Sequence, residues 1–375
     1  MTHKTLPLLA LMAACLPLKV VAEENLATST GATATAAQTF LATLTEVQRG
    51  KVAYDFKDAA QRKNWSNLPT SFVKRGGLRL GDLTQEQRDA AMAVVEAALS
   101  PEGYAKVEEI VEGDEMLKKN DKGGAPRSGQ AGAGGAGAPP SGGAGGPGAP
   151  KGPGRPGGGG PPAFGHDEYY ISFLGQPSTT EPWMIQFGGH HLAINITLAG
   201  AHGTLAPSHT AAQPARYEIE GKTVRPLGDE TDKAHALLTS LTEAQRKQAI
   251  LGFEMRDLVL GPGRDGQTIQ PEGIKGANLT DKQRELLLDL ASEWTGMQSA
   301  DFAKAKMEEM KKNIEDTWFA WSGPVEKGGA AYFRIQGPTV LIEYAPQRLG
   351  GDPTNHIHTI YRDPTNDYGA QWWRP

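Results

Sequence analysis

Four of the nine histidines stand in two short clusters that could bind a metal ion. The first cluster is Gly188-Gly189-His190-His191 and the second is Asn355-His356-Ile357-His358. Imidazole nitrogens are common ligands of Zn²⁺ and Cu²⁺. His356 and His358 are two residues apart, so in an extended segment both side chains project from the same side and can reach one ion. The spacing therefore predicts a metal site at His356 and His358.

The strand pattern after Gly189 indicates how His191 joins that site. Alternation places Leu192, Ile194 and Ile196 on one side of the strand, and His191, Ala193 and Asn195 on the other. A second strand repeats the pattern, with Val340, Ile342 and Tyr344 on one side and Glu343 on the other. The apolar side is the expected core. We therefore expect His191 and Glu343 to share the opposite face, in a crevice between two halves of the chain.

These placements predict a protein that binds a divalent metal ion. Zn²⁺ or Cu²⁺ is best suited to a sulfur-free set of ligands, and Fe or Ni is less clearly suited. An open coordination position would permit hydrolysis or oxidation–reduction chemistry. His190 is either a fourth ligand or a residue behind the ligands. The predicted metal ligands are His190, His191, His356 and His358, and the predicted catalytic residues are Glu343, Arg362 and Asp363. For each histidine taken singly, a buried, hydrogen-bonded core residue is the alternative.

A second interpretation is a non-enzymatic extracytoplasmic module that binds a sugar or peptide. Its aromatic contacts would come from Trp65, Trp183, Trp318, Trp321, Trp372 and Trp373, and its hydrogen bonds from Arg362, Asp363 and Asp367. Tryptophans at strand positions more often belong to the core. Metal-free hydrolysis would need a nucleophile, and Ser208-His209 is predicted to lie in a loop without a triad-like context. The motifs of serine hydrolases and zinc proteases do not occur.

A repeated hexapeptide, Leu-Thr-x-x-Gln-Arg, indicates where the helices that help to position these residues begin. It begins at Leu44, Leu83, Leu241 and Leu279, and the two members of each pair are 39 and 38 residues apart. Thr followed by Gln three residues later is a capping box that starts a helix. The repetition predicts an internally duplicated α+β fold with two pseudo-symmetric halves, each with capped helices followed by antiparallel strands.

The expected helices and strands form separate blocks in each half. Helices are expected near 34–57, 84–99, 101–119, 229–239, 242–254, 281–293 and 299–314. Strands are expected near 168–174, 183–187, 190–198, 330–336, 339–345 and 356–361, and loops at 200–228 and 260–277. The predicted organisation is 1–22 signal peptide, 23–122 helical part of copy one, 123–163 disordered insert, 164–228 strands of copy one and 229–375 copy two.

The N-terminus is typical of an export signal, with a cationic start, an apolar run from Leu6 to Leu18 and a small-residue cleavage site at Ala22. The run is too short and too interrupted by proline to span a membrane. We therefore expect a periplasmic or secreted protein. The alternative is a lipoprotein, anchored through a lipid on Cys15, which is the single cysteine of the chain.

Composition excludes some partners and isolates one segment. The net charge of −5 and the lack of a basic patch argue against binding to nucleic acid. Residues 123–163 consist mainly of Gly, Ala and Pro, which cannot build a core, so they are expected to form a disordered surface insert.

Several of these motifs together resemble domain-of-unknown-function family 3500, a family of mostly exported bacterial and fungal proteins. The similar stretches are 183–195, with its Gly-His-His, and 342–344 followed by 356–364 and 366–369, with their His-x-His and Arg-Asp. The likeness covers most of residues 36–370 apart from the insert. It implies export and a role for these positions, and it names no reaction.

Overall fold

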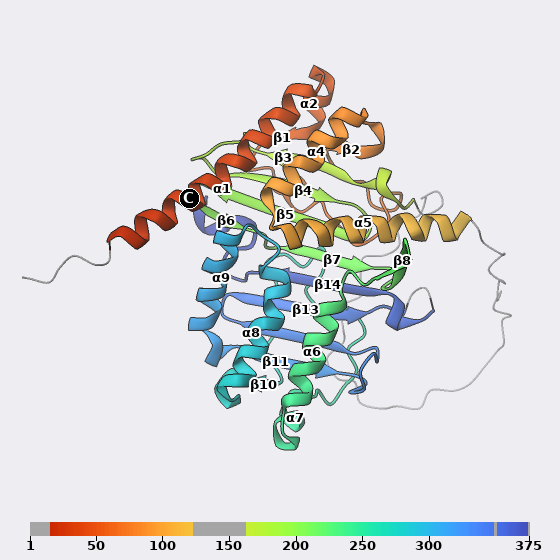
Figure 1. Cartoon of the computed structure of the whole chain (residues 1–375), viewed down its shortest axis with the longest axis vertical. Helices are drawn as coiled ribbons and strands as arrows, with labels where there is room; N and C mark the ends of the chain where they lie inside the picture. Colours follow the sequence, from red (N-terminus) through yellow and green to blue (C-terminus); the bar gives the residue numbers. More distant parts are fainter. Residues whose placement is uncertain (1–15, 123–162, 349–350, 374–375) are drawn as a thin grey trace, which may run out of the picture.

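The computed structural model describes residues 16–122, 163–348 and 351–373. Its centre is one 12-stranded sheet, in which ten strands follow the order β1-β3-β4-β5-β7-β14-β13-β12-β11-β10 (Figure 1). The strands are β1 Ala53–Tyr54, β2 Leu78–Arg79, β3 Tyr170–Leu174, β4 Trp183–Gly188, β5 Leu192–Ala199, β6 His202–Thr204, β7 Ser208–Ala212, β8 Tyr217–Ile219, β9 Lys222–Val224, β10 Ile274–Lys275, β11 Trp318–Ser322, β12 Tyr332–Gly337, β13 Val340–Pro346 and β14 Ile357–Arg362. β8 and β9 pair separately. The predicted α+β class is confirmed.

A layer of helices covers one face of the sheet, as α1, α4, α5, α6, α8 and α9 do in Figure 1. The helices are α1 Leu16–Thr43, α2 Glu46–Val52, α3 Ala59–Arg62, α4 Gln85–Ala98, α5 Pro101–Lys122, α6 Gly228–Ser240, α7 Glu243–Ala249, α8 Asp281–Thr295 and α9 Ala300–Lys312. Trp294 of α8 packs on Phe333 of β12, and Phe40 of α1 packs on Phe173 of β3. The main hydrophobic core therefore lies between the helices and the sheet.

The other face of the sheet is covered by irregular segments, which we call the loop face. Asn67 contacts His358 there, and the Glu343 carboxylate accepts hydrogen bonds from the amides of Val259 and Leu260. A smaller apolar cluster of Trp65, Leu260, Ala193, Leu341 and Ile360 closes this side. Residues near 55–77 and 251–273 thus seal the face on which the histidines were expected.

All four predicted capping boxes are present. Thr45, Thr84, Thr242 and Thr280 each accept from the amide three residues later, and the glutamine at that position returns the contact. A cap of this kind stabilises a helix by about 1 kcal/mol. The glutamines also pair with one another, Gln48 with Gln87 at 3.2 Å and Gln245 with Gln283 at 2.9 Å. The repeated motif therefore joins the helix starts of each half as well as capping them.

The two halves of the sheet contain matching pieces. β3-β4-β5 and β11-β12-β13 are both antiparallel meanders, and a short strand precedes and pairs with the first strand of each, β2 with β3 and β10 with β11. A parallel contact, Ala53 with Phe173 in one half and Ile250 with Trp321 in the other, lies at each end. The internal duplication itself stays a prediction.

The predicted strand faces are confirmed in both halves. Leu192, Ile194, Ile196, Val340, Ile342 and Tyr344 belong to the core beneath the helices. Ala193 and Leu341, on the opposite sides of their strands, belong to the cluster on the loop face. Period-two alternation was sufficient here because each strand buries large apolar residues on the helix side.

The structure departs from the expectations in several places, including the expected loop 260–277, which contains β10. The helix expected at 34–57 is two helices, because the Thr45 capping box starts a new one. Strand β11 was not expected. The segment 200–228, expected to be a loop, contains four strands, and one of them, β7, lies in the middle of the sheet between β5 and β14. The sequence of β7, Ser-His-Thr-Ala-Ala, has no large apolar residue, so it lacks the alternation of apolar and polar residues that would predict a strand.

Two sequence predictions concern the ends and the insert. Residues 1–15, with Cys15, and residues 123–162 of the expected insert lie outside the described part. The predicted cleavage position after Ala22 falls within α1. Among the helices of the described ranges, none combines the length and apolar character needed to cross a bilayer.

Candidate metal centre

The candidate site forms where the two halves of the sheet meet, on either side of β7. His191 immediately precedes β5, whose Leu192 is paired with Thr210 of β7. His358 of β14 is paired with Ala211, which also belongs to β7. The side chain of Ala211 is a single methyl group, so it leaves room for imidazoles from the strands on its two sides. A central strand of small residues is what lets the two histidine clusters approach.

His191, His356 and His358 form a group that could hold one metal ion, since each offers a ring nitrogen within 4.8 Å of the others. The Nε2 atoms of His356 and His358 are 3.0 Å apart, as expected for neighbours on one side of an extended segment. The ring of His191 lies 5.3 Å from that of His356 and 5.9 Å from that of His358, centre to centre. The predicted convergence of these three residues is therefore present.

Asp114 of α5 fixes the orientation of the His191 ring. Its Oδ1 lies 2.7 Å from His191 Nδ1, and its Oδ2 accepts a hydrogen bond of 2.8 Å from the Tyr169 hydroxyl. Burial alone would raise the pKa of the Asp114 carboxyl, but His191 and His190 hold it far below its usual range. The ionised carboxylate therefore accepts a hydrogen bond from the Nδ1–H of His191, which leaves the lone pair on Nε2. Metal-bound histidines typically have such a carboxylate behind them.

Burial favours the neutral form of two of these imidazoles, those of His191 and His358. Burial lowers the pKa of His191 to about 4, with His190 adding to the effect against the opposing pull of Asp114. Burial likewise lowers the pKa of His358 well below its ordinary value. A neutral imidazole is the form that binds metals, so His191 and His358 need no deprotonation near neutral pH.

One ring nitrogen of the site is buried without a hydrogen-bond partner in the part of the chain that the structure describes. The Nε2 of His191 has no hydrogen-bond partner among the described residues, although it is fully buried. A buried polar atom without a partner costs about 1 to 3 kcal/mol, so such atoms are rare unless they have a function. A metal ion bound to Nε2 would satisfy it.

His209 of β7 is a residue of the site that the sequence interpretation missed. Its ring centre is 5.3 Å from that of His358, and it is fully buried. Neither ring nitrogen has a partner of normal hydrogen-bond geometry among the described residues, and burial lowers its pKa to about 3. The Gly- and Pro-rich composition of residues 200–228 predicts a loop, so the sequence assigns His209 to no strand face. The only signal was a histidine between two small polar residues.

His190 belongs to a second group, with Asp114 and His191. Its Nδ1 is 3.3 Å from Asp114 Oδ1, and its ring lies 4.8 Å from that of Phe164 and 3.6 Å from that of His191. It is not a member of the group of three imidazoles. Of the two roles foreseen for it, these contacts favour the position behind the ligands.

Glu343 lies on the loop face, as expected, but belongs to neither of the two groups of potential ligands found in the described residues. Its carboxylate accepts from the amides of Val259 and Leu260, at 2.9 and 2.7 Å, and from the Tyr332 hydroxyl at 2.7 Å. Burial raises its pKa despite these donors. These contacts attach a covering loop to β13, so they supply a structural role.

Arg362 and Asp363 also stand outside both groups and point to opposite faces of the sheet. Arg362 donates to the carbonyl of Leu260 at 2.7 Å and forms an ion pair of 2.8 Å with Asp367. Asp363 forms an ion pair of 2.6 Å with Lys306 of α9. Their catalytic roles stay predictions. The contacts seen for them connect the end of β14 to the covering loop at Leu260 and to helix α9.

The loop face has a cavity of about 540 Å³ near the C-terminus. Arg362, Asp367, Tyr368 and Trp373 are among the residues that line it. Trp65 and Trp183, in contrast, are buried in the fold, and the indole of Trp65 donates to the Tyr368 hydroxyl. Two of the hydrogen-bonding residues expected for a ligand-binding module therefore adjoin an open space, together with one of the expected tryptophans.

Comparison with known proteins identifies the family. The family model described as "Protein of unknown function (DUF3500)" matches residues 27–370, so the chain belongs to this family. The resemblance inferred from the Gly-His-His and His-x-His stretches is thereby confirmed. Searches of curated proteins and of solved structures gave no match.

Proposed function

We propose that this protein is a metal-dependent enzyme that holds one divalent ion, Zn²⁺ or Cu²⁺, through His191, His356 and His358. The observation that carries the proposal is the state of His191. Its Nδ1 is hydrogen-bonded to the ionised carboxylate of Asp114, and its buried Nε2 has no hydrogen-bond partner among the described residues. Two further imidazoles, those of His356 and His358, lie near it. An imidazole fixed in this way is prepared to donate its lone pair to a metal ion.

The ligand set favours hydrolysis. Three neutral imidazoles are one of the ligand sets of catalytic zinc sites, in which the remaining position takes water whose pKa the metal lowers to about 7. Asp114 would hold the His191 ring in place, and His209 would supply a neutral imidazole beside His358. If the bound ion is copper, the same ligands favour oxidation–reduction chemistry instead.

The proposal is tested by metal analysis of the protein purified without a histidine tag. Under metal-replete conditions we expect about one ion per chain by mass spectrometry, and a loss of nearly all of it in the His356→Ala/His358→Ala variant. A matched control, His202→Ala/His235→Ala, removes two histidines outside the site and should keep the ion. Metal-free wild-type protein, or equal metal in both variants, would remove the proposal.

The alternative function is a module that binds a sugar or peptide, and the cavity lined by Arg362, Asp367 and Trp373 favours it as a second candidate. This cavity does not include the three histidines. Binding of a sugar or peptide that survives EDTA and the loss of His356 would therefore support the module over the metalloenzyme.

We propose that the protein acts outside the cytoplasm, and the export signal predicted from the sequence of residues 1–22 supports this location. Mass spectrometry of the mature N-terminus after cell fractionation tests this location. A start at Glu23 supports simple export. A lipid on Cys15, together with release of the Cys15→Ser variant from the membrane, supports the lipoprotein instead. An intact N-terminus in the cytoplasmic fraction contradicts both.

A further inference from the structure

A second candidate site lies on the helix side of the sheet, near the C-terminus. Its walls come from α9, from β6 beside it and from the C-terminal end of the chain, which lie together in Figure 1. The volume is about 390 Å³, within the range of small-molecule sites. The cavity includes neither the three histidines of the metal centre nor Trp373, which lines the cavity of the loop face.

Three polar side chains that line this cavity have side-chain atoms without partners. Gln298, Tyr361 and Asn366 are 3%, 1% and 8% exposed. Within the described residues, the Tyr361 hydroxyl, the Asn366 Nδ2 and the Gln298 Nε2 form no hydrogen bond, and none of these three atoms is fully enclosed by protein. Buried polar groups are normally hydrogen-bonded. Three such atoms around one cavity therefore indicate a bound partner.

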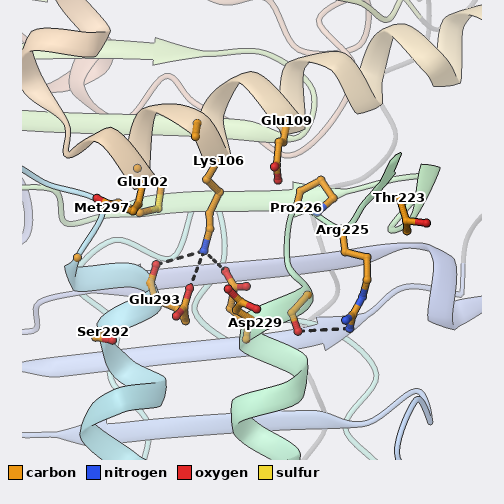
Figure 2. Close-up of a pocket in the computed structure, with 15 residues that line it drawn as sticks. Glu102, Lys106, Glu109, Thr223, Arg225, Pro226, Asp229, Ser292, Glu293 and Met297 are labelled. Atoms are coloured by element: carbon orange, nitrogen blue, oxygen red, sulfur yellow. Dashed lines mark hydrogen bonds and ion pairs between the residues drawn. The ribbon is translucent and has the colours of Figure 1, made fainter. Parts of the chain in front are cut away.

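The larger cavity beneath α5 differs in this respect. Figure 2 shows Lys106 bonded to Glu230 and Glu293, at 2.6 and 3.1 Å, so the protein itself satisfies this cation. Arg225 at its edge is paired with Asp232 at 3.0 Å. The cations of that cavity are therefore engaged by carboxylates of the protein, whereas the neutral groups of the cavity beside α9 are available to a ligand.

The charged side chains of the cavity beside α9 are also engaged with one another. Lys306 Nζ lies 2.6 Å from Asp363, 2.8 Å from Glu309 and 2.7 Å from the Thr339 carbonyl. An ammonium group has three N–H donors, so all three are used. The other oxygen of Asp363 accepts from the Thr365 hydroxyl at 2.8 Å. The lysine and both carboxylates are thus paired, so the cavity does not select a charged ligand.

Aromatic rings complete the walls. The indole of Trp372 stacks on the imidazole of His202, with 5.6 Å between the ring centres, and Phe302 of α9 also lines the cavity. Burial raises the pKa of Tyr361 well above its ordinary value, so its hydroxyl stays protonated. A matching ligand needs an apolar face for the rings and several neutral groups that donate and accept hydrogen bonds. A pyranose sugar has both, in its C–H faces and its hydroxyl groups.

We propose that the cavity between α9, β6 and Trp372 binds a neutral saccharide, with its ring against Trp372 and its hydroxyl groups on Tyr361, Asn366 and Gln298. The site is separate from the metal centre and from the cavity of the loop face, and the proposal rests on neither of them.

Saturation-transfer difference NMR on the full chain tests the proposal, in EDTA so that metal at the histidines cannot contribute. The probes are glucose, galactose, N-acetylglucosamine, maltose, lactose and chitobiose, with triglycine amide as a neutral peptide. We expect saturable binding of at least one saccharide and none of the peptide. Absence of binding by all the saccharides, or binding of the peptide alone, would overturn the proposal.

Tyr361→Phe removes only the hydroxyl and should weaken saccharide binding about threefold to tenfold, the effect of losing one hydrogen bond. Because this hydroxyl has no partner among the described residues, the variant should keep the wild-type Tm. The matched control Tyr170→Phe removes a hydroxyl from β3, outside the cavity, and should leave the affinity within twofold of wild type. Equal affinities of the two variants would contradict the assigned role of Tyr361.

A second variant locates the ligand. Trp372 is half-buried near the end of the chain, so we expect Trp372→Ala to keep the wild-type circular dichroism spectrum and to weaken saccharide binding about tenfold. Unchanged binding by Trp372→Ala would overturn the proposal. Loss of binding with Trp373→Ala alone would do so as well, because it would place the saccharide in the cavity of the loop face.

Discussion

Asp114 of α5 and His191 in front of β5 are joined by a hydrogen bond of 2.7 Å that connects the helix layer to the candidate metal centre. Asp114 is 1% exposed, and its second oxygen is bonded to Tyr169. The carboxylate is thus fully committed, and its position depends on the packing of α5 against β5 and β7. The helix layer therefore sets the direction in which His191 presents its free nitrogen.

We predict that Asp114→Asn weakens metal binding by about 10-fold to 100-fold, the usual effect of losing a carboxylate behind a metal-bound histidine. The amide cannot stabilise the same His191 tautomer as strongly as the charge does. Competition against a chromophoric zinc chelator measures the affinity. The control Glu108→Gln removes a carboxylate from the exposed side of the same helix. An affinity that Asp114→Asn leaves unchanged would show that His191 needs no such support.

Asn67 should tune the site through His358. Its Nδ2 is 3.1 Å from His358 Nδ1, an orientation that leaves the proton on Nε2, which lies 3.0 Å from His356 Nε2. Binding a metal through Nε2 requires the proton on Nδ1, so residue 67 must then present an acceptor. We predict tighter zinc binding, by up to about tenfold, in Asn67→Asp and weaker binding in Asn67→Leu. Asn278→Asp, which adds the same charge at an exposed position, should change nothing. The opposite order of affinities would contradict this role.

The layers of the fold and part of the site follow from local patterns in the sequence. The capping boxes start four helices where expected, and the alternation in β5 and β13 separates core residues from those of the loop face. His356 and His358 converge because their spacing along one extended segment, at the start of β14, is enough to bring them together. These features depend on residues close in sequence, for which spacing and geometry are directly linked.

The remaining parts of the site depend on contacts that no local pattern encodes. Asp114 lies on a helix, 77 residues before His191. Nothing in the sequence distinguishes it from the other acidic residues of that helix. No local pattern marks His209, because the other residues of β7 are small; they fit the crowded centre of the sheet and resemble a loop in sequence. Glu343 was placed on the correct face, but whether it meets the histidines or a covering loop depends on the packing of residues 258–260.

Metal binding should stabilise the fold measurably. An ion that binds only the native state adds about 2.7 kcal/mol to the free energy of unfolding at a free concentration of 100 times its Kd. We therefore expect zinc to raise the Tm of metal-free protein by several degrees, and EDTA to reverse the rise. Scanning calorimetry with and without zinc measures it. The same addition should leave the Tm of His356→Ala/His358→Ala unchanged, and an equal rise in this variant would place the binding elsewhere.

Thr359 provides a test of stability that leaves the metal centre intact. It lies next to His358 on β14 but faces the helices, where its hydroxyl accepts from Trp294 Nε1 at 2.9 Å and contacts the Thr210 hydroxyl at 2.7 Å. Thr359→Val keeps the shape and leaves buried polar atoms without partners, so we predict a loss of about 1 to 3 kcal/mol. Urea unfolding in EDTA measures the loss. Zinc affinity should stay within twofold of wild type, and a larger change would mean that the two faces of β14 are coupled.

His209 should show opposite effects on stability and on metal binding. Its two ring nitrogens are buried without partners of normal geometry in the described part of the chain, so the imidazole costs stability in the metal-free protein. Leucine has a similar size and no polar atoms. We therefore predict that His209→Leu keeps or raises the Tm measured in EDTA, while it lowers zinc affinity about tenfold because the neutral imidazole beside His358 is lost. Paired calorimetry in EDTA and in zinc separates the two effects. A residue that serves the metal site at the expense of stability should, when removed, leave the metal-free fold as stable as before or more stable. A fall in the Tm of the metal-free protein with unchanged zinc affinity would therefore make His209 a packing residue of β7.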